Sequence, residues 1–229
     1  MPANALLGWP FLALVLGVAG LLALLCWPRP PAAPSRWRDP QCLVCLVLPL
    51  YMLHQFEEHG INALGQRYHF IEDLCAWLGQ PDLSHCPASP AFIFAVNVGG
   101  VWLAGLLAIL YRRRNVLVGA CAVGLPLVNA VAHVGQALVR LSYNSGLLTA
   151  VVLFVPFCAW TLRQLFRSGV LDGERLALVV ASGVGMHLVL IGSILAHGAG
   201  LLPQTPLLVL NVVNGGVPWA LASLGRRLP

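Results

Sequence analysis

The chain has 229 residues, of which 59% are hydrophobic and only 9% are charged. Soluble domains carry about 25% charged residues, so this composition excludes an ordinary soluble enzyme or binding domain. The formal net charge is +5, but the chain has no lysine, and its arginines form short clusters between apolar runs. Such clusters are typical of membrane-orientation signals, so nucleic acid is not an expected partner.

Apolar runs near the length of a bilayer span recur along the whole chain. They predict an all-α fold, a polytopic transmembrane helix bundle of about seven spans, which forms a single integral membrane domain over residues 1–229. The first run is expected to be a span and not a cleaved signal peptide, because it is long, lacks a basic segment before it and is followed by arginines. We place the spans at roughly residues 4–27, 40–59, 91–110, 116–139, 147–166, 176–199 and 206–225.

One connection, residues 60–90, is long, and we expect it on the exterior side of the membrane. It is polar and somewhat amphipathic from Phe70 to Leu78, which favours a short interfacial helix. Cys75 and Cys86 both lie in this loop, where the exterior environment permits a disulfide between them.

The arginines indicate the orientation of the chain. Eleven of the thirteen follow the first, third and seventh spans or surround the exit of the fifth, and only Arg67 and Arg140 fall on the other side. The positive-inside rule places the arginine-rich side in the cytoplasm, with the N-terminus outside and the C-terminus inside. We expect a multi-pass protein of a bacterial plasma membrane. The cytoplasmic arginines are Arg29, Arg36, Arg38, Arg112, Arg113, Arg114, Arg163, Arg167, Arg175, Arg226 and Arg227.

The second span ends in a polar run, residues 54–59, with the sequence His-Gln-Phe-Glu-Glu-His. Only residues 42–53 are strictly apolar, which gives about 18 Å of helix where the hydrocarbon core is about 30 Å thick. The polar run must therefore enter the membrane, where an ionised acid costs roughly 2.5–3.5 kcal/mol or more. Two adjacent acids there need a partner, a proton or a metal ion, and His54, Glu57 and Glu58 share one helix face.

The fourth span carries a polar stripe on one helix face, formed by Asn129, His133, Gln136 and Arg140. With each span centred in the bilayer, His133 lies about 8 Å and His54 about 6 Å outward of the midplane. Polar groups from five helices are thus expected to converge towards the outer half of the bundle, where ionisable residues are functional candidates. The other spans contribute Asn97, His187, Asn211 and Asn214.

Three short motifs resemble the signature of the HXXEE-domain family, a group of multi-pass membrane proteins of unknown function that are suspected enzymes. They are His54-x-x-Glu57-Glu58, Asn129-Ala130-x-x-His133 and Tyr143-Asn144-x-Gly146. Each motif lies at a helix end on the same side of the membrane, and Ser145 stands where the family has proline. The resemblance covers about residues 40 to 200, and it implies an enzyme without indicating a substrate.

The candidate metal ligands are His54, Glu57, Glu58 and His133. Two imidazoles with one or two carboxylates suit a divalent ion, zinc or iron, that keeps an open position for water or substrate. The alternative is a structural network in which Arg140 or Arg67 pairs with an acid while the histidines bond between helices. The spacing is neither HExxH nor HxxEH, so the known zinc-protease mechanisms do not transfer.

Three residues are candidate catalytic groups: Glu57 as a general base, Asn129 and Tyr143. Asn129 is expected either to orient a ligand or to bond between helices. Tyr143 lies in a tight turn between the fourth and fifth spans, where it would donate to an oxyanion or rest at the interface. His187 is expected to be a hydrogen-bonded core residue. Three histidines are expected to be solvated in the loop: His59, His69 and His85.

These features favour a membrane-embedded, metal-dependent enzyme, either a hydrolase or an oxidoreductase. Its substrate would be a lipid or another hydrophobic small molecule that enters from the outer half of the bilayer, and nothing in the sequence indicates an oligomeric state. The alternative is a proton- or ion-coupled transporter in which Glu57 and Glu58 titrate and His133 relays protons. The lack of evident repeats counts against transport. A non-catalytic scaffold would give the acid pair no role.

The predicted orientation can be tested with reporter fusions. Reporters fused after Arg114 and after Arg227 should be active in the cytoplasm, and a reporter near Pro81 should be active outside, because the arginine-rich connections stay inside. A cytoplasmic signal at Pro81 would contradict the layout and every depth derived from it.

Overall fold

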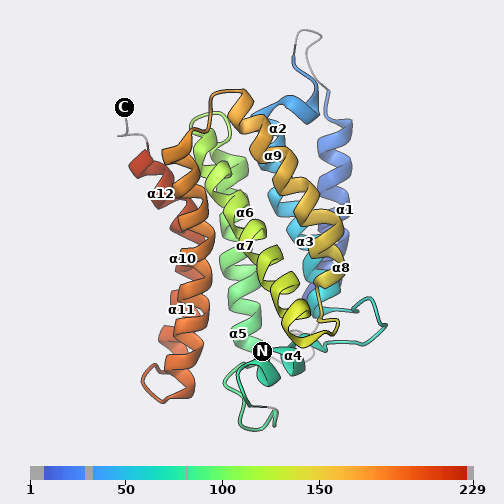
Figure 1. Ribbon diagram of the computed structural model, residues 1–229, viewed down its shortest axis with the longest axis vertical. Helices are drawn as coiled ribbons and strands as arrows, with labels where there is room; N and C mark the ends of the chain where they lie inside the picture. Colours follow the sequence, from blue (N-terminus) through green and yellow to red (C-terminus); the bar gives the residue numbers. More distant parts are fainter. Residues whose placement is uncertain (1–7, 29–32, 81, 226–229) are drawn as a thin grey trace.

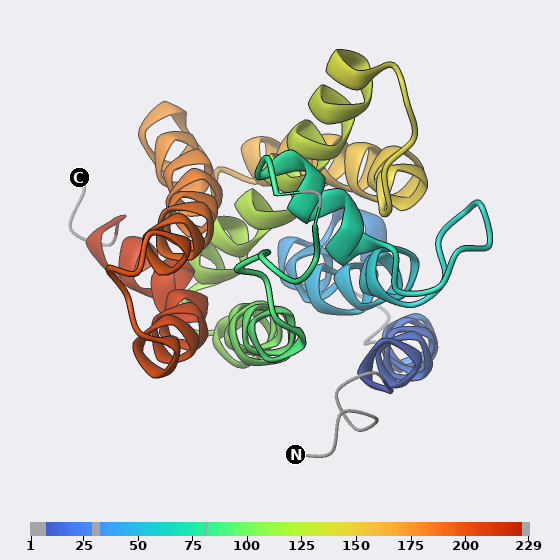
Figure 2. The ribbon, with the colours of Figure 1, turned by 90° about the horizontal axis from the view of Figure 1, so that it is seen from below.

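The structure, a computed structural model, describes residues 8–28, 33–80 and 82–225. In these ranges the chain forms a bundle whose long helices run roughly along one axis (Figures 1 and 2). The one β-type pairing among the described residues is an isolated bridge between Ile61 and Arg67. The expected all-α class is confirmed.

Six helical stretches in the described ranges are long and apolar enough to cross a membrane, and they match six of the seven expected spans. Three are composite: the third and fifth expected spans contain π-helical segments, η3 and η4, and the seventh contains a 3-10 turn, η5. The expected first span begins at residue 4, which lies outside the described residues. The segments are α1 (Trp9–Cys26), α5 (Pro90–Phe94), η3 (Ala95–Val101), α6 (Trp102–Tyr111), α7 (Val116–Arg140), α8 (Leu147–Thr149), η4 (Ala150–Phe154), α9 (Val155–Arg167), α10 (Gly173–Gly198), α11 (Gln204–Val213), η5 (Asn214–Gly216) and α12 (Val217–Gly225).

The expected second span is divided into two helices, α2 (Pro40–Cys45) and α3 (Val47–His59), which meet at Leu46. Pro49 explains the break, because its ring lacks an N–H and crowds the carbonyl four residues earlier, that of Cys45. Neither piece alone has the length of a span, although together they cover the expected range. The count of seven spans and the orientation remain predictions.

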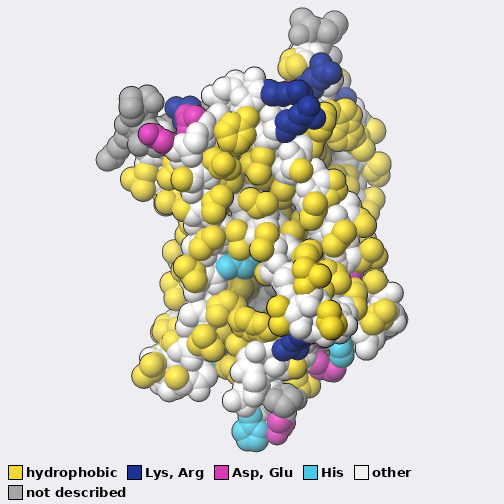
Figure 3. Space-filling model, in the orientation of Figure 1, with side chains coloured by type: hydrophobic (Ala, Val, Ile, Leu, Met, Phe, Trp, Pro, Cys, Tyr) yellow, Lys and Arg dark blue, Asp and Glu magenta, His cyan; other side chains and the backbone are white. Residues whose placement is uncertain are grey.

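The connections divide between the two ends of the bundle (Figure 1). The α1–α2, α6–α7 and α9–α10 connections lie at one end together with α12, whereas the long loop after α3 and helix α4 (Phe70–Trp77) lie at the other. Arginine side chains gather mainly at the first end in the view of Figure 3. This division agrees with the predicted orientation. Four positions used in that prediction lie outside the described residues: Arg29, Pro81, Arg226 and Arg227.

Helices α7 and α10 cross closely at two glycines. A Cβ on Gly124 would lie 2.0 Å from the carbonyl oxygen of Val179, and a Cβ on Gly183 would lie 2.0 Å from the carbonyl oxygen of Gly124. Only glycine permits this approach of two backbones. Between the crossing and the arginine-rich end the interior is filled with apolar side chains, among them Val118 and Cys121, which are fully buried. Open space therefore begins on the other side of the crossing.

Helix α4 covers that other end of the bundle. It confirms the short helix expected around Phe70 to Leu78, and a disulfide joins its Cys75 to Cys86, with Cα atoms 5.6 Å apart. The side chain of Asp73 accepts a hydrogen bond from the backbone N–H of Ser145 at 2.9 Å, which ties α4 to the connection between α7 and α8. The expected Cys75–Cys86 disulfide is confirmed in the structure.

The intact mass of the purified chain should increase by about two daltons when this bond is reduced, and a Cys86→Ser variant should lack that part of the increase. Closing a loop of this length contributes roughly 2–3 kcal/mol in the chain-entropy description, so the variant should also melt earlier. An unchanged mass on reduction of the wild type would contradict the bond.

Candidate metal centre

Three side chains from two helices converge in the half of the bundle that α4 covers. His54 and Glu58 come from α3, one turn apart, and His133 comes from α7; one ligand atom from each lies within 4.8 Å of the others. His133 Nε2 lies 3.2 Å from Glu58 Oε1, and His54 Nε2 lies 3.6 Å from Glu58 Oε2. All three residues are buried, His54 completely. The expected convergence of the two histidines with a carboxylate is present.

The tautomer of His54 follows from its outer partner. His54 Nδ1 lies 2.8 Å from the hydroxyl oxygen of Thr149. That hydroxyl has one proton, and its other two neighbours, a Glu57 carboxylate oxygen and the Gly146 carbonyl, can only accept. The hydroxyl must therefore accept from His54 Nδ1–H. The proton sits on Nδ1, and the lone pair of Nε2 points at the site.

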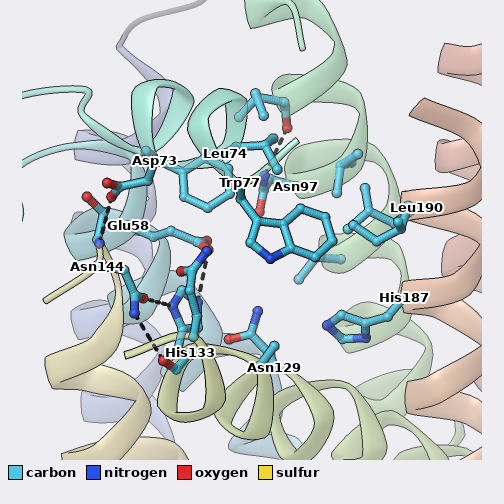
Figure 4. Close-up of a pocket in the computed structure, with 18 of the residues that line it drawn as sticks. Glu58, Asp73, Leu74, Trp77, Asn97, Asn129, His133, Asn144, His187 and Leu190 are labelled. Atoms are coloured by element: carbon cyan, nitrogen blue, oxygen red, sulfur yellow. Dashed lines mark hydrogen bonds and ion pairs between the residues drawn. The ribbon is translucent and has the colours of Figure 1, made fainter. Parts of the chain in front are cut away.

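The tautomer of His133 is set in the same way. Asn144 donates from its side-chain nitrogen to the backbone carbonyl of His133 at 3.0 Å, which fixes the orientation of the amide. Its Oδ1 then faces His133 Nδ1 at 2.6 Å and accepts a hydrogen bond from it (Figure 4). His133 Nε2 is thus directed at Glu58. Outer partners that hold one ring nitrogen of each imidazole are typical of histidines that bind metal through the other.

The geometry fits a divalent ion. Ligands bound at 2.0–2.2 Å around a tetrahedral ion lie about 3.3–3.6 Å from one another. His133 Nε2 and His54 Nε2 lie 3.2 and 3.6 Å from the two different oxygens of Glu58, and one ligand atom from each of the three residues lies within 4.8 Å of the others. His54 Nε2 is buried and has no hydrogen-bond donor among the described residues. A lone pair that faces a carboxylate at 3.6 Å is repulsive unless a cation or a proton lies between them. The three residues could hold a metal ion.

Glu57 points away from this group, contrary to the expectation that it is a ligand or a general base. It accepts hydrogen bonds from the backbone N–H groups of Leu148 and Thr149 at 3.2 and 2.8 Å, from the Thr149 hydroxyl and from the Tyr143 phenol. Burial, and then the bond to Glu57, raise the pKa of Tyr143, so the phenol stays a donor. Both Glu57 oxygens are therefore occupied, because they hold the first turn of the α8–α9 helix. Glu57 supports His54 through Thr149.

Gly146 closes the turn that carries these outer partners. Its φ is +98°, and a Cβ there would lie 2.8 Å from the Cε1 atoms of both His54 and His133. Any other residue would be strained in this conformation and would collide with both imidazoles. The expected tight turn is present, and it lies directly against the site.

The histidines of the loop behave differently from one another. His69 is partly exposed and His85 is exposed, but His59 is buried, so the expectation that it is solvated is wrong. The His59 ring packs against Trp9 and Phe70, with centroids 5.2 and 4.4 Å apart. Its Nε2 lies 2.8 Å from Glu58 Oε2 but is not oriented for a hydrogen bond. Helical spacing gave no sign that His59 is buried near Glu58, since His54 and His59 lie on different faces of the helix.

The alternative network with arginine does not form. Among the described residues, neither Arg67 nor Arg140 forms an ion pair with Glu57 or Glu58. Sequence reasoning also gave no role to Thr149 and named Asn144 only as part of a motif. Their positions depend on how the α7–α8 connection folds back.

A cavity of about 460 Å³ lies beside the group. Glu58, His133 and Asn144 stand on one side of it, and His187 and Leu190 stand on the opposite side (Figure 4). Asn129 points into the cavity, one turn before His133. His187 is partly exposed, and its Nδ1 donates to the carbonyl of Gly183 at 2.8 Å, so it is hydrogen-bonded as expected. Glu58 and His133, two of the three candidate ligands, therefore form part of the wall of a cavity that can admit a molecule.

Comparison with known proteins identifies one family. A family model described as a protein of unknown function with an HXXEE motif matches residues 45–161, half of the chain. The match includes His54, Glu58, His133, Asn144 and Thr149. No curated protein and no solved structure matches the chain.

The outer role of Thr149 can be tested by metal affinity. Thr149→Val removes the hydroxyl that holds His54 Nδ1–H and should weaken zinc binding by about 10–100-fold, because outer partners orient the ligand. Thr149→Ser should bind like the wild type. Thr161 is a buried threonine on α9 without a partner among the described residues, so Thr161→Val is the matched control. Wild-type affinity in Thr149→Val would disprove the role.

Proposed function

The chain belongs to the HXXEE family, and from its site we propose that it is a membrane-embedded, metal-dependent enzyme that acts on a hydrophobic substrate. One observation carries the proposal: the lone pair of a fully buried histidine, His54, faces the carboxylate of Glu58, with His133 Nε2 beside it. His133 Nε2 lies within hydrogen-bonding distance of Glu58 Oε1, at 3.2 Å, but His54 Nε2 has no partner, whereas a purely structural network would place a donor there. A bound cation would convert the same arrangement into three ligands.

Two histidines and one carboxylate suit zinc, and they also suit ferrous iron. Bound zinc would supply a Lewis acid and would lower the pKa of a bound water, which supports hydrolysis. Bound ferrous iron would supply redox chemistry with dioxygen, which supports oxidation. The remaining contributions come from the chain itself. Thr149 and Asn144 orient the imidazoles, Tyr143 and the backbone hold Glu57, and the apolar packing around His54 excludes bulk water.

The cavity favours a substrate that arrives through the membrane. Val131 and Val139 of α7 both line it and are 66% and 85% exposed, so the chamber opens sideways on this face of the bundle. Figure 3 shows a hollow surrounded by hydrophobic side chains. In the predicted orientation this opening faces lipid in the outer half of the bilayer. A lipid or a similar hydrophobic molecule can therefore reach His133 without crossing water.

Transport is less well supported. A transporter needs a path from the site to the cytoplasmic side, but α7 and α10 touch backbone to backbone at Gly124 and Gly183. Beyond that crossing, Val118 and Cys121 belong to a close-packed apolar core. Glu57, the other acid that a proton pathway would use, is occupied by four hydrogen bonds.

Metal analysis of the purified protein tests the proposal. We expect about one zinc or iron ion per chain in the wild type, and less than about a tenth of that in His54→Ala, His133→Ala and Glu58→Gln, because each change removes a ligand. Activity on a hydrophobic substrate should be lost in parallel. His197→Ala is the matched control, since His197 bonds to the Leu202 carbonyl at the end of α10 and does not line the cavity.

Each variant should also be checked for folding by its melting temperature. A wild type that binds neither metal after loading, or a His133→Ala variant that binds it as the wild type does, would contradict the proposal. Loss of fold in all three variants, with no metal in the wild type, would support a structural network instead.

A further inference from the structure

The cavity is also lined by polar side chains outside the group of His54, Glu58 and His133, called here the second wall. Three asparagines line it, Asn129 on α7, Asn211 on α11 and Asn214 on η5, and the side-chain oxygen of each is buried without a hydrogen-bond partner among the described residues. The residues Asn211 and Asn214 are 2% and 8% exposed. We propose that this wall is a subsite for a hydroxyl group of the substrate.

The orientation of two of the amides is fixed by their nitrogens. Asn211 Nδ2 donates to the Leu207 carbonyl and to the Ser193 hydroxyl, both at 2.9 Å. Asn214 Nδ2 donates to the Met186 carbonyl, also at 2.9 Å. A backbone carbonyl can only accept, so the nitrogen must occupy these positions and the free atom must be the oxygen. Both residues therefore offer an acceptor.

A fourth acceptor faces the same space. His187 donates from Nδ1 to the Gly183 carbonyl, so in its neutral form Nε2 carries a lone pair. His187 lies across the cavity from His133 (Figure 4). Asn97, which also lines the cavity, shows the contrast: its oxygen accepts from Gln55 and its nitrogen donates to the Ile93 carbonyl, so it is satisfied. The buried atoms without a partner on this wall are thus the three asparagine oxygens, and hydrogen bonds fix those of Asn211 and Asn214 as acceptors.

A wall of unmet acceptors selects a ligand that donates hydrogen bonds. A buried oxygen without a donor is costly, and a ligand hydroxyl removes that cost for the one oxygen that accepts its proton, whereas an ether or a hydrocarbon does not. An ammonium group would also donate, but this wall has no carboxylate to balance its charge in the membrane. The acids that line the cavity, Glu58 and Asp73, lie on the side of His133 (Figure 4).

The proposed subsite narrows the class of substrate that the proposed enzyme would accept. Asn129 lies one helical turn from His133, so the hydroxyl would be held about 6 Å along the helix from the metal ligand. The apolar body of the molecule would occupy the lining between them, near Leu190 and Ile194. The substrate class is therefore a hydrophobic alcohol whose reacting group lies near, but apart from, its hydroxyl. This reading of the reaction rests on the proposed function, while the subsite itself can be tested by binding alone.

The test compares dodecanol with dodecyl methyl ether, two probes that differ in the hydroxyl proton. Binding to the full chain in detergent would be measured by native mass spectrometry, with and without added zinc. The wild type should prefer the alcohol by about tenfold, the value of one or two good hydrogen bonds. Asn129→Leu and Asn214→Leu should each lower this preference by about threefold or more, and binding of the ether should persist.

Gln164→Leu is the matched control, because Gln164 is a buried amide on α9 that does not line the cavity. Asn214→Leu also removes the bond to Met186, so its melting temperature is measured, and Asn129→Leu, which is only partly buried, carries the test if that variant does not fold. Equal binding of the two probes by the wild type, or a preference that survives in Asn129→Leu, overturns the subsite. If the wild type prefers the alcohol but binds no metal, the result supports the subsite and counts against the proposed enzyme. If the wild type binds metal but does not prefer the alcohol, the result supports the enzyme and overturns the subsite.

Discussion

The arrangement of this half of the bundle depends on one buried carboxylate. Glu58 is 6% exposed, and imidazoles approach it from α3 and α7. Within a membrane such a charge is stable only when positive charge or donors surround it. Glycine contacts, the disulfide-linked α4 and the connection after α7 all act to bring groups to this point and to keep lipid away from it. The cavity is the space that remains once those groups are in place.

The α7–α8 connection does more for the site than any single helix. It supplies Asn144 to His133 and also Gly146, against which both rings pack, and the short helix α8 that follows it supplies Thr149 to His54. Helices α3 and α7 contribute ligands, but neither helix alone determines which nitrogen of each ring faces inward. Helix–helix packing thus brings the two imidazole rings close together, and a short segment after α7 determines which nitrogen of each ring faces the site. Functional residues are often carried by loops on a rigid scaffold. Here the segment supplies no candidate ligand itself but holds the ligands through hydrogen bonds.

Hydrophobic periodicity predicted the class and the helix bounds well, because each span must bury its backbone polar groups in its own helix. Depth and facing predicted that His54 and His133 meet. The same reasoning misplaced Glu57, since a shared helix face does not reveal which N–H groups lie opposite, and these come from residues about ninety positions away. It also missed His59, whose burial depends on Trp9 and Phe70 from distant segments. Contacts between remote segments carry no periodic signature.

The π-helical segment η4 has a consequence for how His54 is held. Thr149 bonds to Nδ1 of this imidazole, and Phe154, five residues later, packs against its ring with centroids 4.5 Å apart. On a regular α-helix, residues five apart point about 140° away from each other, so they could not contact one ring. The wider turn from Ala150 to Phe154 brings both onto one face. Deleting a single residue there would restore a regular helix and release the ring from one of its two contacts, so the spacing of this segment matters as much as its composition.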